Sequence, residues 1–206
     1  MTIFRKPTGW LAVVVGAALL IGGVAIASNM GFKYTTDIQA DESFNLSLPW
    51  NNNYTTAEDL RTDLGADRVS KVRTDATFQN WFPGSFGNNF DTVAKEAYVV
   101  TAGGTAIQEH VVRSHDPTAT IDLTADEAKN VAAPYHQTLT TANELFQDIE
   151  GQLGAETLDR VSKIRADATF QNWFPGSFGN NFDLDLGMGV VVFAKATAGG
   201  YQYPHY

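Results

Sequence analysis

The sequence predicts an α+β fold, rich in β-structure, in which two duplicated small units follow an N-terminal signal helix. The first observation is a near-identical block: residues 67–91 and 159–183 agree at 23 of 25 positions, at an offset of 92 residues. The second is that the same helix and strand signals recur around each block. We therefore expect each unit to contain one short helix and about five mostly antiparallel strands.

The repeat extends beyond the block on both sides. Upstream, residues 49–60 agree with 134–145 at 5 of 12 positions, at an offset of 85 residues. These limits predict a linker at 28–37, a first repeat unit at 38–116 and a second at 117–206. A unit of this size buries only about 60–65% of its unfolded surface, so we expect the two units to pack on each other.

The N-terminus has the three parts of an export signal. Arg5 and Lys6 precede an uncharged apolar stretch at 11–27, which ends in the small residues of Ala25-Ile26-Ala27. This pattern predicts that residues 1–27 are a signal peptide and that the protein is secreted or held in the cell envelope. The alternatives are an uncleaved membrane anchor, because the stretch is at the short limit for crossing a bilayer, and a pilin-type leader.

Composition excludes several classes of protein. The 206 residues include no Cys, which rules out disulfides, Cys-ligated metal centres and a thiol nucleophile. The formal net charge of −9 argues against nucleic acid as a partner, since phosphate neutralisation needs Lys and Arg. Contact with a membrane is expected only through the N-terminal segment, if that segment is not removed.

Each unit opens with a strand and a capped helix. Residues 43–48 alternate apolar and polar side chains, as strands do. Thr56 and Thr141 each stand three residues before an acid, which is a capping-box pattern, and Gly65 and Gly154 are placed to end the two helices.

The rest of each unit is predicted to be β-structure. Short strands are expected at 69–73 and 77–82, before a Pro83-Gly84 turn. Further strands are expected at 96–101 and 189–194 and, last, at 107–112 and 201–203. The unbroken apolar run at 190–193 predicts a central strand there. Since the first copy has Lys95-Glu96 where the second has Gly187-Met188, the starts of these two strands are not expected to pack alike.

The duplicated segment FQNWFPGSFGNNF allows two interpretations. As a ligand platform, its aromatic faces would stack on sugar rings while its amides bind hydroxyl groups. As a structural hairpin, its aromatic rings would fill the core, which is their commoner role and the interpretation we favour. The residues assigned to a ligand or assembly surface are Gln79, Asn80, Trp81, Phe86 and Asn88, with Gln171, Asn172, Trp173, Phe178 and Asn180 in the second copy.

Core packing does not explain why the polar positions of this segment are also identical. Either a recent sequence exchange copied the block, or both copies present the same surface. Burial of Gln79, Asn80 and their partners in local hydrogen bonds would remove the reason to expect a binding face.

Catalytic and metal-binding patterns have little support. Ser114, His115 and Asp116 are consecutive, so their side chains diverge and do not form a nucleophile–base line. The four His lack metal-type spacing, and no cofactor is expected. Calcium is kept as an alternative at the second copy, whose oxygen ligands would be Asn180, Asn181, Asp183 and Asp185.

Two short motifs occur in both units: Leu48-Pro49-Trp50, matched by Ala133-Pro134-Tyr135, and the loop Gly87–Phe90, matched by Gly179–Phe182. They resemble the opening strand and the loop of uncharacterised tandem-repeat modules of exported bacterial proteins. In those modules an SLPY-like strand precedes a TTAEDL helix, and a GxNF loop precedes a PGEGY-like turn, from which this chain departs. The resemblance implies an exported modular protein and supplies no site residues.

These observations favour a non-catalytic structural or interaction protein of the cell surface or extracellular space. Its partners would be other copies of itself, through self-assembly, or other cell-surface components. The alternative is a secreted carbohydrate-binding module that uses the duplicated aromatic and Asn segment to bind glycans.

Overall fold

The computed structural model describes residues 32–48, 52–84, 87–113, 120–134, 137–176 and 179–204. The predicted signal segment at 1–27, and Phe86, Phe178 and the Ser114-His115-Asp116 sequence, lie outside these residues. Neither helix of the described residues has the length and apolarity that crossing a bilayer requires.

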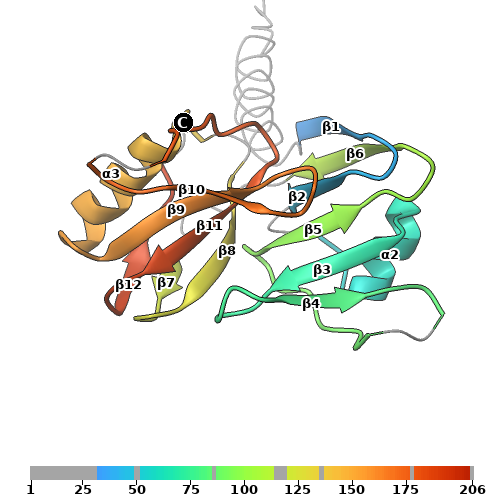
Figure 1. The fold of residues 1–206 in the computed structure, drawn as a ribbon, viewed down its shortest axis with the longest axis horizontal. Coiled ribbons are helices and arrows are strands. Elements are labelled where there is room, and N and C mark those ends of the chain that lie inside the picture. The colour runs from blue at the N-terminus through green and yellow to red at the C-terminus, as the bar shows by residue number, and fades with distance from the viewer. Residues whose placement is uncertain are drawn as a thin grey trace, which may run out of the picture. The chain divides into compact units, whose positions relative to one another are not determined.

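The described chain is a β-rich mixture of sheet and helix, as predicted, with two helices and four antiparallel sheets. Figure 1 shows the elements along the chain. The first half contains β1 (Phe32–Ile38), β2 (Ser43–Ser47), α2 (Ala57–Leu64), β3 (Arg68–Val72), β4 (Phe78–Trp81), β5 (Ala97–Thr101) and β6 (Ile107–Arg113). The second half contains β7 (Ile121–Leu123), β8 (Ala128–Ala132), α3 (Ala142–Leu153), β9 (Leu158–Ile164), β10 (Phe170–Trp173), β11 (Gly189–Ala194) and β12 (Ala198–Tyr201).

The two halves have the same topology. The first forms a four-stranded sheet in the order β2-β5-β3-β4 and the second a sheet in the order β8-β11-β9-β10. In each half a separate two-stranded sheet joins the first and last strands, β1 with β6 and β7 with β12. The central position predicted for residues 190–193 is confirmed, because β11 lies between β8 and β9.

The near-identical blocks form hairpins with the same register. Val69 pairs with Trp81 and Val72 with Phe78 in the first half. At the same offset of 92 residues, Val161 pairs with Trp173 and Ile164 with Phe170 in the second.

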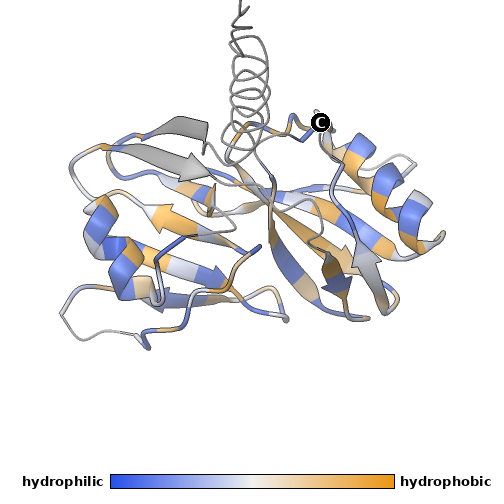
Figure 2. Cartoon of the chain, turned by 180° about the vertical axis from the view of Figure 1, so that it is seen from behind, coloured by the Kyte–Doolittle hydropathy of each residue, from blue (hydrophilic) through white to orange (hydrophobic). Residues whose placement is uncertain are grey.

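Both predicted capping boxes are present at the helix starts. The Thr56 hydroxyl accepts from the Asp59 amide and the Asp59 carboxylate accepts from the Thr56 amide, and Thr141 and Glu144 do the same for α3. Each helix carries both hydrophilic and hydrophobic residues (Figure 2). The apolar residues of α2 pack into the core of the first half and those of α3 into the core of the second.

The strand count differs from the prediction, because each half has six strands rather than about five. β1 occupies most of the segment expected to be a linker, residues 28–37. β7 has only three residues. Both segments alternate apolar and polar residues, as in Phe32-Lys33-Tyr34 and Ile121-Asp122-Leu123, but they are short of a strong strand signal until β6 and β12 pair with them.

The halves meet through residues at equivalent positions. Asn45 and Asn130, 85 residues apart, are both buried and exchange side-chain hydrogen bonds of 2.8 and 2.9 Å. The rings of Phe78 and Phe170, 92 residues apart, stack with centroids 5.5 Å apart. Residues 32–206 thus form one compact unit.

The outer edges of β2 and β8 are also paired across this contact. The amide of Ser43 donates to the Ala166 carbonyl (2.8 Å), and the equivalent amide of Ala128 donates to the Thr74 carbonyl (2.7 Å). Further along, Ser47 donates to Gly187 and Ala132 to Lys95, each at 2.8 Å. Each half therefore covers the strand edge that the other would leave open.

The closeness of this contact depends on a missing side chain at Gly189. A Cβ atom there would overlap the Cβ of Ala97 and lie 2.8 Å from the Asn45 amide nitrogen. This explains why the starts of β5 and β11 differ. Ala97 begins β5, and its methyl group fits only because β11 begins with Gly189, which has no side chain.

We expect Gly189→Ala to destabilise the protein by about 1–3 kcal/mol, the cost of inserting a methyl group into a packed interior. Urea denaturation followed by tryptophan fluorescence measures this. The control is Gly151→Ala in α3, where no atom lies within 4 Å of the added Cβ and a gain of about 0.5–1 kcal/mol is expected. Equal stability of Gly189→Ala and the unmodified protein would contradict the close approach of the halves.

Candidate functional site

The amides at the centre of the duplicated segment are engaged locally. Ser70 donates its hydroxyl to Asn80 at 2.7 Å, and Ser162 does the same to Asn172 at 2.7 Å. Both Asn side chains are half-buried. They lie on the same face of their hairpins as Phe78 and Phe170, so they belong to the face through which the halves meet.

The glutamines lie on the opposite face of the same strands. Gln79 is half-buried and its amide donates to the Asn88 carbonyl at 3.4 Å, while Gln171 is also half-buried. Of the predicted surface residues that are described, only Asn88 and Asn180 are exposed.

Trp81 and Trp173 point towards the helices, where they meet different neighbours. The Trp81 indole donates to the Glu58 carboxylate (2.6 Å), which Arg61 also binds through two nitrogens at 2.7 and 2.9 Å. Together, Arg61 first and Trp81 second, these donors lower the pKa of Glu58 to about 2.

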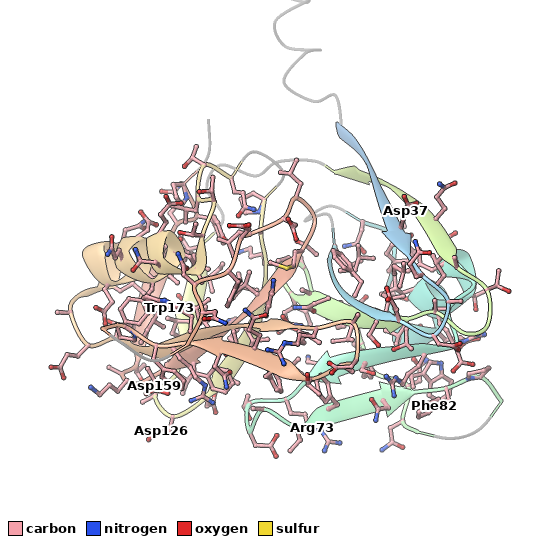
Figure 3. The ribbon with its side chains drawn as sticks, turned by 45° about the horizontal axis from the view of Figure 1, so that its top comes forward. Asp37, Arg73, Phe82, Asp126, Asp159 and Trp173 are labelled. Atoms are coloured by element: carbon pink, nitrogen blue, oxygen red, sulfur yellow. The ribbon has the colours of Figure 1, made fainter. Side chains whose placement is uncertain are left out.

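In the second half the same tryptophan is held by an aromatic contact. Phe146 stands at the position equivalent to Arg61 and meets Trp173 edge-on, with ring centroids 5.3 Å apart. Trp173 is buried and lies beneath α3 (Figure 3). Trp173 is buried and Trp81 is half-buried against the core of the first half, so neither indole is exposed as a wide platform for a sugar ring.

The GNNF loops fasten the helix starts. Asn89 accepts the Glu58 amide at 3.1 Å, and Asn181 accepts the equivalent Asn143 amide at 2.9 Å. The next carbonyl in each loop, from Phe90 or Phe182, accepts the first amide of the helix. These bonds satisfy helix amides that have no partner within the helix. Asn89 and Asn181 therefore have a structural role at the helix starts.

A glycine is required where each loop returns to its strand. Gly87 and Gly179 have φ of 111° and 108°, and a Cβ on either would collide with the carbonyl of Asn80 or Asn172. The loops thereby form bridges to Trp81 and Trp173 and cover part of the outer edges of β4 and β10.

Calcium binding at the second copy stays a prediction. Of its proposed ligands, Asn181 is committed to the start of α3. Within the part of the chain that the structure describes, no group of three or more His, Cys, Asp or Glu side chains is arranged to hold a metal ion.

Two hollows lie where the halves meet, at positions equivalent to one another. The first boundary cleft has a volume of about 410 Å³ and the second of about 370 Å³. Lys71, Val72 and Arg73 line the first, and Lys163, Ile164 and Arg165 line the second at the offset of 92 residues. Sequence reasoning missed both, because the opposite wall of each comes from the other half. The only sequence signal for these clefts was the Lys and Arg that each block carries two residues apart. Strand alternation places them on one face of a strand but does not show what that face meets.

Comparison of the chain with protein-family models, with curated proteins and with solved structures finds no match. The assignment of function therefore depends on the residues and their geometry.

The Glu58 contacts predict a pH-dependent contribution to stability. Because the pKa of Glu58 is depressed from its ordinary 4.5 to about 2, its contribution is complete above pH 4.5 and is lost as the pH falls towards 2. The side chain is 40% exposed, so solvent screening reduces the effect. We expect Glu58→Gln to cost about 1 kcal/mol at pH 7 and to lose that difference near pH 2.

Thermal unfolding from pH 2 to pH 7 measures this difference. The matched control is Asn143→Ala, at the equivalent position of α3, which should show no such pH dependence because Asn143 carries no charge. A constant difference between Glu58→Gln and the unmodified protein over the whole range would contradict the role of the carboxylate.

Proposed function

We propose that the chain is an exported, non-catalytic structural or interaction protein of the cell surface or extracellular space, built from a duplicated unit whose two copies act as one rigid body. It would bind other cell-surface components or further copies of itself. The duplication is supported by the sequence blocks and by the shared strand order and hairpin register of the halves.

The observation that carries this proposal is that the residues identical in the two blocks make structural contacts. Ser70, Asn80 and Phe78, with their partners in the second half, serve hairpin hydrogen bonds and the contact between halves. Asn89 and Asn181 fasten the helix starts. The polar side chains of the block therefore make structural contacts, which is typical of a scaffold that presents surfaces and is not typical of an active site.

The covered strand edges limit how self-assembly would work. β2 and β8 are paired with the opposite half, and the loops at Gly87 and Gly179 partly cover β4 and β10. Adding strands to the four-stranded sheets is thus disfavoured, and association would use side-chain surfaces.

Export is supported by the sequence of the first 27 residues, with Arg5, Lys6 and the Ala25-Ile26-Ala27 site. The absence of Cys is compatible with an oxidising compartment, since no thiol is available for wrong pairing.

The carbohydrate-binding alternative has less support at the duplicated segment. It needs exposed indole faces, whereas Trp81 is bound to Glu58 and Trp173 is packed on Phe146. The exposed Asn88 and Asn180 are the parts of that segment still available to a glycan.

Expression of the full chain in a bacterium with a Sec pathway tests export. We expect the protein outside the cytoplasm, beginning at Ser28 after cleavage, and N-terminal sequencing of the fractionated product measures this. A matched variant with Arg5→Glu and Lys6→Glu should be retained, because the positive start of the signal is lost. Cytoplasmic accumulation of the unmodified chain with Met1 intact would contradict the proposal.

Light scattering of the exported form over a range of concentrations, with binding to intact cells, tests the interaction role. A strict monomer that binds no cell surface would count against it.

A further inference from the structure

The first boundary cleft has walls from both halves and is distinct from the predicted aromatic surface. Lys71, Arg73 and Glu96 lie on one side, and Glu127 and Lys129 on the other. Two smaller hollows adjoin it and share Glu96 and Lys129 at one end and Glu127 at the other. Arg73 follows β3, at the start of the turn to β4 (Figure 3).

The floor of this cleft is largely aliphatic. Its buried apolar side chains are small and none is aromatic: Val72, Ala97, Leu123, Ala128 and Ala194. The one buried polar side chain in its lining is Asn130, whose amide is bound to Asn45 and to the Ala97 carbonyl. The rim is polar and charged. A volume of about 410 Å³ falls in the range of small-molecule sites. A ligand that fits such a surface needs C–H groups on one face and many hydrogen-bonding groups at its edge.

Two rim groups have unused hydrogen-bonding capacity. Within the described residues, the Arg73 guanidinium and the Glu127 carboxylate have no hydrogen-bond or ion-pair partner. The Arg73 guanidinium has only hydrogen-bond donors and the Glu127 carboxylate has only acceptors. A hydroxyl group both donates and accepts, so the two residues together can bind the hydroxyl groups of one ligand.

The other charged groups of the lining have partners within the described residues. Lys71 forms a 3.1 Å ion pair with Glu96, and the Lys129 ammonium donates to the backbone carbonyl of Asp122 at 2.9 Å. The Asp75 carboxylate accepts from the Thr77 hydroxyl at 2.6 Å, and the Asp122 carboxylate accepts from the Gly200 amide at 2.9 Å. Both signs occur on both walls, so a ligand with one strong charge meets repulsion as well as attraction there, whereas a neutral polar ligand does not. A zwitterion is the competing kind of ligand, because Arg73 and Glu127 have opposite charges.

The second boundary cleft is less polar at three equivalent positions. Phe44, Ala166 and Met188 stand where the first cleft has Lys129, Thr74 and Glu96. The basic pair and the facing carboxylate are the same in both, as Lys71, Arg73 and Glu127 or Lys163, Arg165 and Glu42. The first cleft adds the polar side chains of Lys129, Thr74 and Glu96 to this shared set, and these additional groups are the reason to place a hydroxyl-rich ligand there.

We infer that the first boundary cleft binds a neutral, hydroxyl-rich ligand of the size of one or two sugar rings, with Arg73 and Glu127 as its main hydrogen-bonding residues. This inference goes beyond the proposed function and does not depend on export or on self-assembly. It places glycan binding at the junction of the halves rather than on the duplicated aromatic segment.

Amide chemical shifts of the ¹⁵N-labelled chain test this, with glucose, galactose, mannose, N-acetylglucosamine and maltose as probes. We expect at least one probe to shift amides around Arg73, Glu127 and Lys129, with a Kd on the order of 1 mM, since a small ligand makes few hydrogen bonds. Glycine and inorganic phosphate serve as the zwitterionic and anionic comparators and should shift none of these amides.

Matched variants locate the site. Arg73→Ala and Glu127→Gln should each weaken binding by about tenfold, corresponding to one charge-assisted hydrogen bond. Arg165→Ala, at the equivalent place in the second cleft, should change the Kd by less than about twofold. The spectra of the variants report whether each is folded.

Three results would overturn the inference. The first is that no neutral probe shifts the cleft amides at about ten times the expected Kd. The second is that Arg73→Ala and Glu127→Gln, both folded, bind the sugar as the unmodified chain does. The third is that glycine or phosphate occupies the cleft in preference to the sugars, which would replace a neutral ligand by a charged one.

Discussion

The contact between the two halves is the constraint on which the rest of this structure depends. Its centre is the buried pair Asn45 and Asn130, each of which satisfies the other's amide. A buried amide without a partner costs about 1–3 kcal/mol, so burying this contact requires both residues to be present. The backbone bonds from β2 and β8 to the opposite half add the same requirement at the strand edges. The halves consequently depend on each other for satisfied polar groups as well as for apolar burial.

Near-identical sequence is used in two different settings by this arrangement. Ser70, Asn80 and Phe78 meet the same kind of environment as their partners, because equivalent faces are turned towards each other. Trp81 and Trp173 do not, since α2 offers Glu58 and Arg61 where α3 offers Asn143 and Phe146. The helices differ in sequence while the hairpins are nearly identical, so one indole is held by a charged network and the other by an aromatic ring. Only the network around Trp81 holds its indole through a carboxylate, that of Glu58.

The same arrangement creates surfaces that neither half has alone. Each boundary cleft takes a Lys and an Arg from one block and its opposite wall from the other half. Because Phe44 and Met188 stand in the second cleft where the first has Lys129 and Glu96, the clefts differ in polarity although their Lys and Arg residues are identical. The proposed interaction role and the inferred ligand site are compatible, because both would use surfaces of one compact unit.

The sequence by itself determined the local elements, because capping boxes, glycine stops and apolar alternation act over a few residues. It predicted α2, α3, the β3–β4 and β9–β10 hairpins and the central place of β11, and it identified the block whose polar residues needed explanation. Tertiary structure decided the rest. It made strands of β1 and β7, turned Asn80 and Asn172 towards the contact between halves, and brought Arg73 opposite Glu127. Those outcomes depend on which residues distant in sequence become neighbours, and local propensity carries no information about that.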